Sequence, residues 1–282
     1  MTQSITKHVS LHIDCGGFNT SLYSRSDSGK ITKHKTFCKG SDFLRFKHAL
    51  IYLKSLDLNW DALFVGLRGY SNKSKIEKFQ SFIYSFFPNK VLKIMPDYEE
   101  IWQRTFSKTE SGLVLSSGTG AFCYGRKSGI RAHAGGFGLN FYDPGGSIYL
   151  GYKVLFHLLQ KLDSPDEVPD ILEKEILNRF NVKKSREWSL HFRDEGSKTR
   201  TLAQIGDIYL IYCKECHYSG KILNENISFL IRFLRNVAMM LDIKHNDRFS
   251  LMLHGGLIER HPFYAKKITD SIEKIFPKSS IF

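Results

Sequence analysis

The chain has 282 residues, of which 42% are hydrophobic and 13% aromatic, and this composition excludes a disordered protein. Lys and Arg number 41 against 28 Asp and Glu, so the net charge is +13, which favours an anionic partner such as nucleic acid, a membrane surface or a phosphorylated ligand. The first residues lack the apolar run of a signal peptide, and no stretch approaches the roughly 20 apolar residues of a membrane helix. We therefore expect neither export nor membrane insertion.

The first hundred residues predict alternating strands and helices. VSLHID is rich in β-forming residues, and a Ser-Asp-Ser-Gly turn separates two further extended runs. Later segments alternate between helical spacing of apolar residues and short apolar runs typical of buried strands. The predicted strands lie over 9–14, 19–24, 29–32, 62–67 and 91–95, and the predicted helices over 43–56 and 74–86.

The pattern then starts again at residue 112. GLVLSS predicts a buried strand that ends in a glycine turn, and a second hairpin follows it. Helices are predicted over 147–161, 168–180, 201–217, 222–242 and 259–275, with a strand over 249–254. Two strand–hairpin–helix units about a hundred residues apart indicate two similar α/β domains, 1–105 and 106–282.

Three glycine turns follow buried strands, at Gly16-Gly17, Gly118-Thr119-Gly120 and Gly255-Gly256. A glycine turn lets backbone N–H groups converge on an anion with no Cβ in the way, although glycine also serves tight turns for geometry alone. The chain has neither a Walker-type phosphate loop nor a Gly-x-Gly-x-x-Gly turn. Together, the three turns predict a phosphate-binding region.

Two aspartates end predicted strands. Asp14 precedes the first glycine turn, where it would hold the hydration shell of Mg²⁺ against phosphate. Asp97 ends the strand VLKIM, and a carboxylate at the C-terminal end of such a strand faces the ligand side of an open α/β sheet. The alternative for each is an aspartate that caps the next helix or turn.

In order, these landmarks resemble the sugar-kinase/heat-shock-chaperone/actin ATPase superfamily. Within it, the chain is most similar to the family of N-acetylglucosamine kinase, glucosamine kinase and the benzoyl-CoA reductase-type ATPases. Residues 13–17 resemble the first phosphate motif, 115–120 the second, and 253–257 the adenosine motif. Gly135-Gly136-Phe137-Gly138, followed by Asp143-Pro-Gly145 and Tyr149-Leu-Gly151, resembles the sugar-binding stretch. The resemblance implies two ribonuclease H-like (actin-like ATPase) domains flanking a nucleotide cleft.

The resemblance also implies roles for individual residues. Asp97 falls on the catalytic base, and Asp14 on the aspartate that orients Mg²⁺, through water. The implied nucleotide-binding residues are Gly16, Gly17, Asn19, Thr20, Gly118, Thr119, Gly120, Gly255 and Gly256, and the implied sugar-binding residues are Arg68, Gly135, Gly136, Phe137 and Asp143.

The chain departs from the family pattern at several positions. Phe18 replaces the usual Thr of the first phosphate turn, so Asn19 or Thr20 would substitute for it, and Pro144 and Gly146 replace the usual Glu and Ser. Arg68 replaces a small residue, so it would meet an acidic substituent of the sugar, unless it is a surface residue of a turn. The final helix of the family also has no counterpart after residue 282.

Five cysteines without an export signal favour reduced thiols and a cytoplasmic protein. Cys213-Lys-Glu-Cys216-His217 matches the pattern of covalent haem attachment and half of a zinc site, but simple packing is favoured. The family's activator ATPases hold an iron–sulfur cluster through cysteines, and Cys123 keeps that alternative open. His12, like His133 and His254, is predicted as a strand-edge or core residue.

The sequence thus predicts an ATP-dependent kinase, with Mg²⁺, that phosphorylates a hydroxyl of glucosamine, N-acetylglucosamine or a related hexose. The partners expected are the sugar and ATP, with no nucleic acid and no membrane; a homodimer is left open. The alternatives are a catalytically impaired or regulatory ATP-binding protein of the same fold, which Phe18 and Pro144 favour, and an activator-type ATPase.

Overall fold

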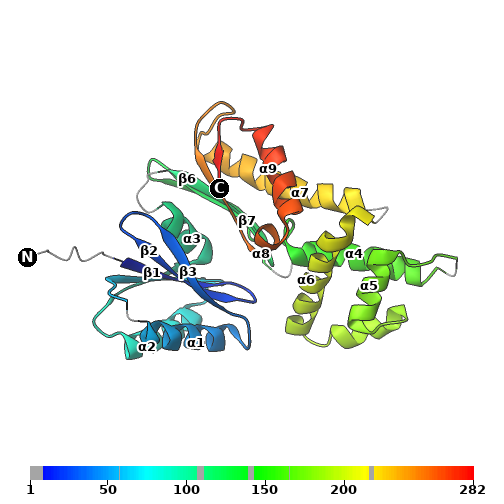
Figure 1. Ribbon diagram of the computed structural model, residues 1–282, viewed down its shortest axis with the longest axis horizontal. Helices are drawn as coiled ribbons and strands as arrows, with labels where there is room; N and C mark the ends of the chain where they lie inside the picture. The colour runs from blue at the N-terminus through cyan, green and yellow to red at the C-terminus, as the bar shows by residue number, and fades with distance from the viewer. Residues whose placement is uncertain (1–8, 57, 107–110, 139–142, 165, 216–218) are drawn as a thin grey trace, which may run out of the picture. The chain divides into compact units, whose positions relative to one another are not determined.

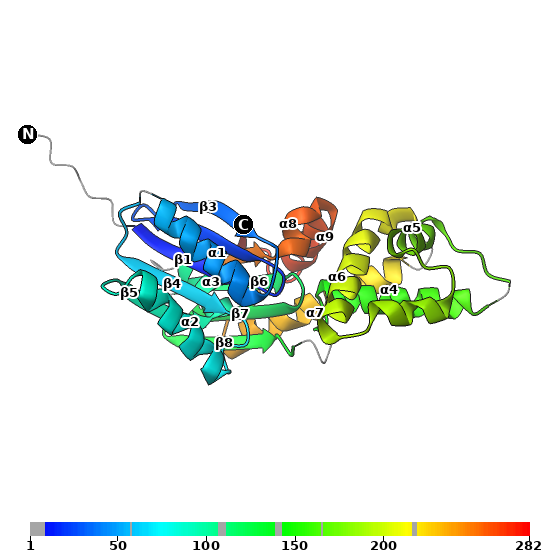
Figure 2. The same cartoon turned by 90° about the horizontal axis from the view of Figure 1, so that it is seen from below.

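The computed structural model describes residues 9–56, 58–106, 111–138, 143–164, 166–215 and 219–282. The chain divides into two compact units, Met1–Glu110 (unit 1) and Ser111–Phe282 (unit 2), and each is described by itself. Figures 1 and 2 show their strands and helices.

Both units contain a five-stranded mixed sheet with the same topology. Unit 1 has the order β3-β2-β1-β4-β5, and unit 2 has the matching order β8-β7-β6-β9-β10. In each, the first three strands along the chain are antiparallel, and the last two run parallel to the first. The predicted α/β fold class is confirmed. The strands are β1 (Val9–Cys15), β2 (Thr20–Ser26), β3 (Ile31–Phe37), β4 (Ala62–Leu67), β5 (Val91–Pro96), β6 (Gly112–Ser117), β7 (Ala121–Lys127), β8 (Ile130–Gly135), β9 (Ser250–His254) and β10 (Ser280–Ile281).

Three helices cover the two faces of the unit 1 sheet. In Figure 1, α1 (Asp42–Ser55) and α2 (Lys73–Phe86) lie on one face, and α3 (Asp97–Phe106) lies on the other. Figure 2, seen from below, shows α1 and α2 in front of the strands. Ser41 and Asn72 cap α1 and α2, because each side chain accepts a hydrogen bond from a backbone N–H of the first turn.

The residues of β1 alternate between these two faces, as a strand requires. Leu11, Ile13 and Cys15 are buried in the apolar core together with residues of α1 and α2. Each large apolar side chain buried in this way contributes about 1.5–3 kcal/mol. His12 and Asp14 point to the opposite face, where α3 packs, so the same strand supplies both the core and a polar layer.

Unit 2 places a group of helices beside its sheet. α7 packs on β7 and β8, while α4 and α6 pack closely against each other. Glycines permit that close approach, because a Cβ on Gly151 would lie 1.8 Å from the Leu202 carbonyl oxygen, and one on Gly206 would lie 2.2 Å from that of Ser147. The helices are α4 (Ser147–Leu162), α5 (Ile171–Phe180), α6 (Glu195–Tyr212), α7 (Ser219–Met240), α8 (Gly256–Arg260) and α9 (Pro262–Glu273), with 3₁₀ turns η2 (Ser185–His191) and η3 (Cys213–Glu215).

The predicted elements are found, with differences at their ends. The helix predicted from 201 begins at Glu195, because Asp194 caps it ahead of the first apolar residues. The single helix predicted over 259–275 is wrong, because α8 ends at Arg260 and α9 begins again at Pro262. α3 continues through Phe106, one residue past the predicted domain boundary. Within the described residues, none of the helices has the length and apolar content needed to span a membrane.

Candidate active site

Three parallel strands of unit 1 end side by side. Cys15 of β1 pairs with Leu67 of β4, and Leu67 pairs with Pro96 of β5. The residues that follow these three are Gly16, Arg68 and Asp97, so the register brings them to one edge of the sheet. Asp14, one residue before the end of β1, lies close enough to Asp97 to act on its carboxylate electrostatically. The structure therefore brings together the predicted residues Asp14, Arg68 and Asp97.

Asp97 is the first residue of α3, and its Oδ1 accepts a hydrogen bond from the backbone N–H of Tyr98 at 3.0 Å. Burial raises the pKa of Asp97 to about 6, and the negative charge of Asp14 adds to this effect. The Tyr98 N–H and the positive charge of Arg68 act in the opposite direction. A carboxylate with this pKa is mostly ionised at neutral pH and still accepts a proton more readily than an ordinary aspartate, as a general base requires.

Gly66 determines how closely α3 approaches the sheet. A Cβ at this position of β4 would lie 2.7 Å from the Glu100 Cβ and 3.1 Å from the Asp97 Cα. Because the Asp97 atom belongs to the backbone, it cannot move away without shifting the start of the helix. Gly66 is therefore a positioning residue for Asp97 that the sequence analysis did not identify.

A buried charged cluster lies below Asp14, between β1 and α3. His12 Nδ1 lies 2.9 Å from Glu100 Oε1, and both side chains are almost fully buried. Arg104, one helical turn after Glu100, lies 3.5 Å from the same oxygen through Nε and 3.9 Å from Asp14 Oδ2 through Nη2. We name Asp14, His12, Glu100 and Arg104 the charged cluster.

Aromatic rings enclose the charged cluster. The Arg104 guanidinium lies 3.7 Å from the centre of the Tyr23 ring, and His12 stacks on Phe64 at 5.0 Å. Glu100 Oε2 has no hydrogen-bond partner within the described residues. Burial opposes the charge of Arg104, but Glu100, Tyr23 and Asp14 outweigh it and raise its pKa. Arg104 therefore stays charged beneath Asp14. The prediction of His12 as a strand-edge or core residue identified its burial but not its partners.

Arg45 of α1 holds the first glycine turn. Its guanidinium donates to the carbonyl oxygens of Gly17 at 3.0 Å and Gly16 at 3.4 Å, and also to that of Gly40 at 2.6 Å. Because the carbonyl groups of Gly16 and Gly17 are engaged with this buried side chain, the turn has a fixed conformation. Arg45 was not among the predicted site residues.

The two polar residues that would replace the missing Thr of this turn differ in exposure. Asn19 is exposed, whereas Thr20 is fully buried and its hydroxyl has no hydrogen-bond partner within the described residues. A phosphate contact from Thr20 would require the hydroxyl to leave the protein interior. Phe18, which stands in place of the usual Thr, is partly buried.

In unit 2, the second and third glycine turns lie against each other. A Cβ on Gly255 would lie 2.5 Å from the Ser117 carbonyl oxygen, and one on Gly118 would lie 3.6 Å from the Gly256 nitrogen. The first turn of α4 is bonded to the second of these turns, because the Ser147 N–H donates to the Gly118 carbonyl oxygen at 2.8 Å. The structure thus groups the predicted residues Gly118, Thr119, Gly120, Gly255 and Gly256.

Asp143 lies directly over the second glycine turn. A Cβ on Gly120 would lie 2.2 Å from its Oδ2, and its Oδ1 accepts a hydrogen bond from the Gly138 N–H at 2.9 Å. The residue is almost fully buried and has a left-handed φ of 34°, which is uncommon for a residue other than glycine. The carboxylate therefore packs against the second glycine turn and is bonded to Gly138.

The rest of the predicted sugar-binding stretch lies at the end of β8. Gly135 and Gly136 both have positive φ, and the Gly136 N–H donates to the Ala121 carbonyl oxygen at 2.8 Å. Phe137 is 56% exposed, with one ring edge toward Phe233, so it offers a stacking surface. Residues 139–142 lie outside the described residues.

A neutral network fixes the backbone below Asp143. Ser117 Oγ donates to the Gly145 carbonyl oxygen at 2.6 Å, and the Gly145 N–H donates to Asn226 Oδ1 at 3.0 Å. Asn226 Nδ2 in turn donates to the Tyr264 hydroxyl at 2.8 Å. We name Ser117, Asn226 and Tyr264 the neutral network; all three are buried.

Beside Gly256, an ion pair joins α6 to the end of α8. Arg260 Nη2 lies 2.8 and 2.9 Å from the two oxygens of Asp207, and His261 Nε2 lies 3.0 Å from Oδ1. Burial opposes the charge of Asp207, but the hydrogen bonds from His261 and Arg260 outweigh it and lower its pKa. The Arg260 guanidinium lies over the third glycine turn, since a Gly256 Cβ would meet Nη1 at 2.5 Å. This pair was not predicted from the sequence.

The described residues contain no group of three or more His, Cys, Asp or Glu side chains placed to hold a metal ion. Asp14 fits the weaker binding of Mg²⁺ through water, since a second carboxylate, Asp97, lies near it and Mg²⁺ prefers oxygen ligands. Cys123 is fully buried, and burial raises the pKa of its thiol. Cys213 is also buried, whereas Cys216 and His217 lie outside the described residues.

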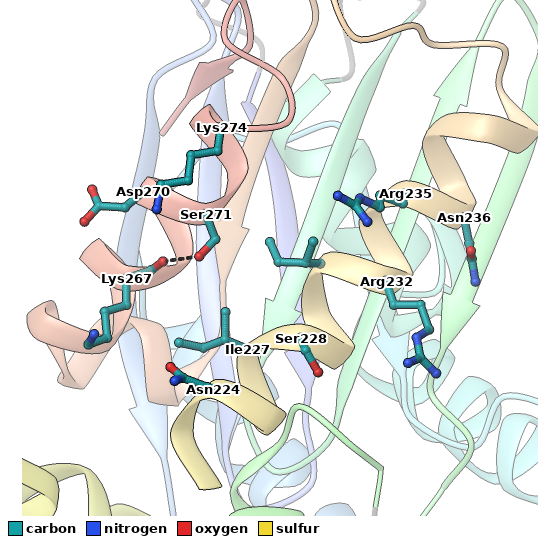
Figure 3. Close-up of a pocket in the computed structure, with 11 residues that line it drawn as sticks. Asn224, Ile227, Ser228, Arg232, Arg235, Asn236, Lys267, Asp270, Ser271 and Lys274 are labelled. Atoms are coloured by element: carbon teal, nitrogen blue, oxygen red, sulfur yellow. Dashed lines mark hydrogen bonds between the residues drawn. The ribbon is translucent and has the colours of Figure 1, made fainter. Parts of the chain in front are cut away.

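A groove of about 650 Å³ runs between α7 and α9 in unit 2, and Figure 3 shows its lining. Arg232 and Arg235 come from α7, Lys267 comes from α9, and Lys274 directly follows the last residue of α9. None of the predicted site residues lines it.

No protein-family model matches the chain. In sequence, the chain is 27% identical over 172 residues to the N-acetylmuramic acid/N-acetylglucosamine kinase of Clostridium acetobutylicum, a match that covers 60% of this chain and 56% of that protein. The chain thus spans just over half the length of this curated relative. The predicted resemblance to amino-sugar kinases is confirmed.

In structure, the chain matches a protein of Chromobacterium violaceum that is provisionally assigned as an N-acetylglucosamine kinase, with a TM-score of 0.70, 15% identity, and coverage of 98% of this chain and 95% of that chain. A glucokinase of the ROK family from Streptomyces griseus, in complex with glucose and AMPPNP, matches with a TM-score of 0.53, 10% identity, and coverage of 96% and 89%. These matches confirm the sugar kinase/actin-like ATPase fold.

Proposed function

We propose that this protein is an ATP-dependent kinase that phosphorylates a hydroxyl of an amino sugar or a related hexose. The observation that carries the proposal is Asp97: a partly buried carboxylate with a pKa of about 6, beside a second carboxylate, Asp14, at the ends of parallel strands. The named relative acts on N-acetylated amino sugars, which supports an amino sugar as the acceptor. The glucokinase binds an ATP analogue, which supports ATP as the phosphoryl donor.

In the proposed mechanism, Asp97 accepts the proton of the sugar hydroxyl as the oxygen attacks the γ-phosphorus of ATP, and the bond from that phosphorus to the bridging oxygen breaks to release ADP. Asp14 would hold Mg²⁺ through water, and the bound metal would supply positive charge to the transferring phosphoryl group. The N–H groups of the glycine turns bind phosphate, and Gly256 lies near the adenosine. Asp143, Gly135, Gly136 and Phe137 bind the sugar.

The test is ADP release from Mg²⁺-ATP with glucosamine, N-acetylglucosamine and glucose as acceptors. Asp97→Asn is expected to lower turnover by roughly 10²–10⁴-fold and to leave nucleotide binding intact, because the amide cannot accept the proton. Asp61→Asn is the matched control, since Asp61 is exposed and precedes β4 at the opposite end of the same sheet. Unchanged turnover in Asp97→Asn would remove Asp97 from this role.

A second candidate is a regulatory ATP-binding protein that does not transfer phosphate. It is favoured by the Asp143 carboxylate, which is buried on Gly120 and bonded to Gly138, and by the buried Thr20 hydroxyl. Nucleotide binding without stimulation of ADP release by any of the three sugars would select this candidate.

We also propose that the protein acts in the cytoplasm, because three of its cysteines are buried as free thiols, which suits a reducing compartment. A homodimer is a further proposal, which light scattering of the purified protein tests.

A further inference from the structure

The groove between α7 and α9 lies in unit 2, and no residue of the candidate active site lines it. Its volume of about 650 Å³ is that of a small-molecule site. Each helix gives it one row of side chains three or four residues apart, which is the spacing of residues on one helical face. In Figure 3 one row runs from Asn224 to Arg235 on α7, and the other runs from Lys267 to Lys274, directly after α9.

The matching pair of helices in unit 1 is joined by aromatic rings instead. Phe43 of α1 packs edge-on against Phe79 and Phe82 of α2, with ring centres 5.3 Å apart in both pairs. α1 and α2 precede β4 and β5 as α7 and α9 precede β9 and β10, so the two helix pairs hold equivalent places in the repeated topology. The open, polar groove is therefore a feature of unit 2 and not a requirement of the fold.

The two walls of the groove are fixed relative to each other. Asn226 of α7 donates to the hydroxyl of Tyr264 of α9 at 2.8 Å, and both side chains are buried. Ile227 and Ile231, which also line the groove, are buried and give it an apolar floor. A ligand would therefore meet a preformed site and would order few side chains on binding.

The groove carries an excess of positive charge. Among the described residues that line it, one carboxylate, that of Asp270, stands against four cations, Arg232, Arg235, Lys267 and Lys274. Asp270 is already paired with Lys266 of its own helix, at 2.9 Å between Nζ and Oδ1. None of the four cations makes an ion pair within the described part of the chain. The groove therefore favours a ligand with more than one negative charge.

The other lining residues narrow the class of anion. An arginine guanidinium offers a fork of donors that matches a phosphate group. Asn224, Ser228 and Ser271 add neutral donors and acceptors of the kind that hydrogen-bond to hydroxyl groups. The described lining residues include no aromatic ring on which a nucleotide base could stack.

We propose that this groove is a binding site for a small phosphorylated sugar, with the phosphate among the four cations and the sugar hydroxyls on the asparagine and serine side chains. The inference stands apart from the proposed function, because it concerns binding at a place that the candidate active site does not include.

The experiment is calorimetric titration of the full chain with glucose 6-phosphate. Arg235→Gln combined with Lys274→Gln is expected to raise the Kd about 10- to 100-fold at an unchanged melting temperature, since both residues are exposed and each would lose a charge-assisted hydrogen bond. The matched control is Lys221→Gln combined with Lys278→Gln, which removes two exposed cations that do not line the groove. It should change the Kd by less than about threefold.

Excess N-acetylglucosamine separates the groove from the candidate active site. Affinity for glucose 6-phosphate that is unchanged by this sugar supports the groove, whereas displacement by the sugar without an effect of the groove variant would overturn the proposal. Equal losses in the two double variants would also overturn it, because the ligand would then respond only to overall charge. If the protein phosphorylates no sugar, the proposed function fails, and the two double variants still decide the groove.

A further arm titrates a short single-stranded RNA, because a longer polyanion could use the same cations. Tighter binding of the RNA than of glucose 6-phosphate, weakened by the change at Arg235 and Lys274, would overturn the proposal and assign the groove to nucleic acid. Absence of binding of glucose 6-phosphate to the wild type would refute it outright.

Discussion

The two units repeat one topology but present different chemistry at the ends of their strands. Unit 1 presents side chains, with Asp14, Arg68 and Asp97 after neighbouring strands. Unit 2 presents backbone, with glycine turns after β6 and β9. Side chains can exchange protons and select substrates, whereas N–H groups bind anions without titrating. The comparison shows that a shared topology fixes where functional groups gather but leaves their kind to a few residues.

The buried residues that hold these strand ends in place also differ between the two units, since those of unit 1 are charged and those of unit 2 are neutral. In unit 1 the charged cluster of Asp14, His12, Glu100 and Arg104 fills the space between β1 and α3. In unit 2 the neutral network of Ser117, Asn226 and Tyr264 holds Gly145. Buried charges depend strongly on their partners, whereas a neutral hydrogen bond contributes only about 1 kcal/mol. The two units should therefore respond unequally to the loss of one support residue.

The largest effect is expected for Arg104→Met. Removal of this guanidinium leaves Glu100 buried without its cation, which should cost about 3–5 kcal/mol of unfolding free energy in urea. Tyr264→Phe, which removes only one hydroxyl from the neutral network, should cost about 1 kcal/mol. Equal losses in the two variants would show that the charged and neutral supports do not differ.

A smaller effect is expected for Gly120→Ala, which adds one carbon to the second glycine turn. The new Cβ would lie 2.2 Å from Asp143 Oδ2, so the carboxylate or the turn must shift. Overpacking of this kind costs about 1–3 kcal/mol, and we expect it to appear as weaker binding of Mg²⁺-ATP in calorimetry. Gly129→Ala is the control, because Gly129 has a φ of 82° but no atom within 4 Å of the added carbon. It should lower stability by about 1 kcal/mol and leave binding unchanged.

A third effect concerns pH and stability. The pKa of Asp97 is raised from 3.8 to about 6 in the folded protein, so protonated Asp97 favours folding; this contribution is complete below pH 3.8 and is lost as pH rises through 6. Asp97→Asn should therefore raise the melting temperature at pH 8 and have little effect near pH 4, although it removes the proposed base. A difference in melting temperature that is constant over this range would contradict the assignment.

The fold was largely predictable because apolar periodicity decides which segments are strands and helices. The strands over 62–67 and 112–117 were predicted at their observed bounds. The start of α6 was not, because residues 195–200 lack apolar spacing, although the Asp194 and Ser197 pair is a recognisable cap. The break between α8 and α9 could also have been predicted from Pro262, since proline favours the first turn of a new helix.

The candidate site was predictable only where a residue ends a strand. Asp14 and Asp97 follow apolar runs, and the register brings them together. The charged cluster was not predicted, because Ser10, His12 and Asp14 alternate with apolar residues in a pattern that also describes a strand facing water. Only the packing of α3 shows that this face is covered. The spacing of Glu100 and Arg104, four apart on one helix, was the available signal.

The absence of a side chain at Gly66 has a consequence for how this protein can vary. Any other residue there would push on the first turn of α3, so the distance between helix and sheet is set by a single hydrogen atom. Position 66 would then be as intolerant to replacement as Asp97, the proposed base, although Gly66 performs no chemistry. In a survey of variants scored by growth or turnover, replacement of Gly66, which sets the distance between helix and sheet, would cause the same loss as replacement of Asp97. Only a separate measurement of folding would distinguish the two positions.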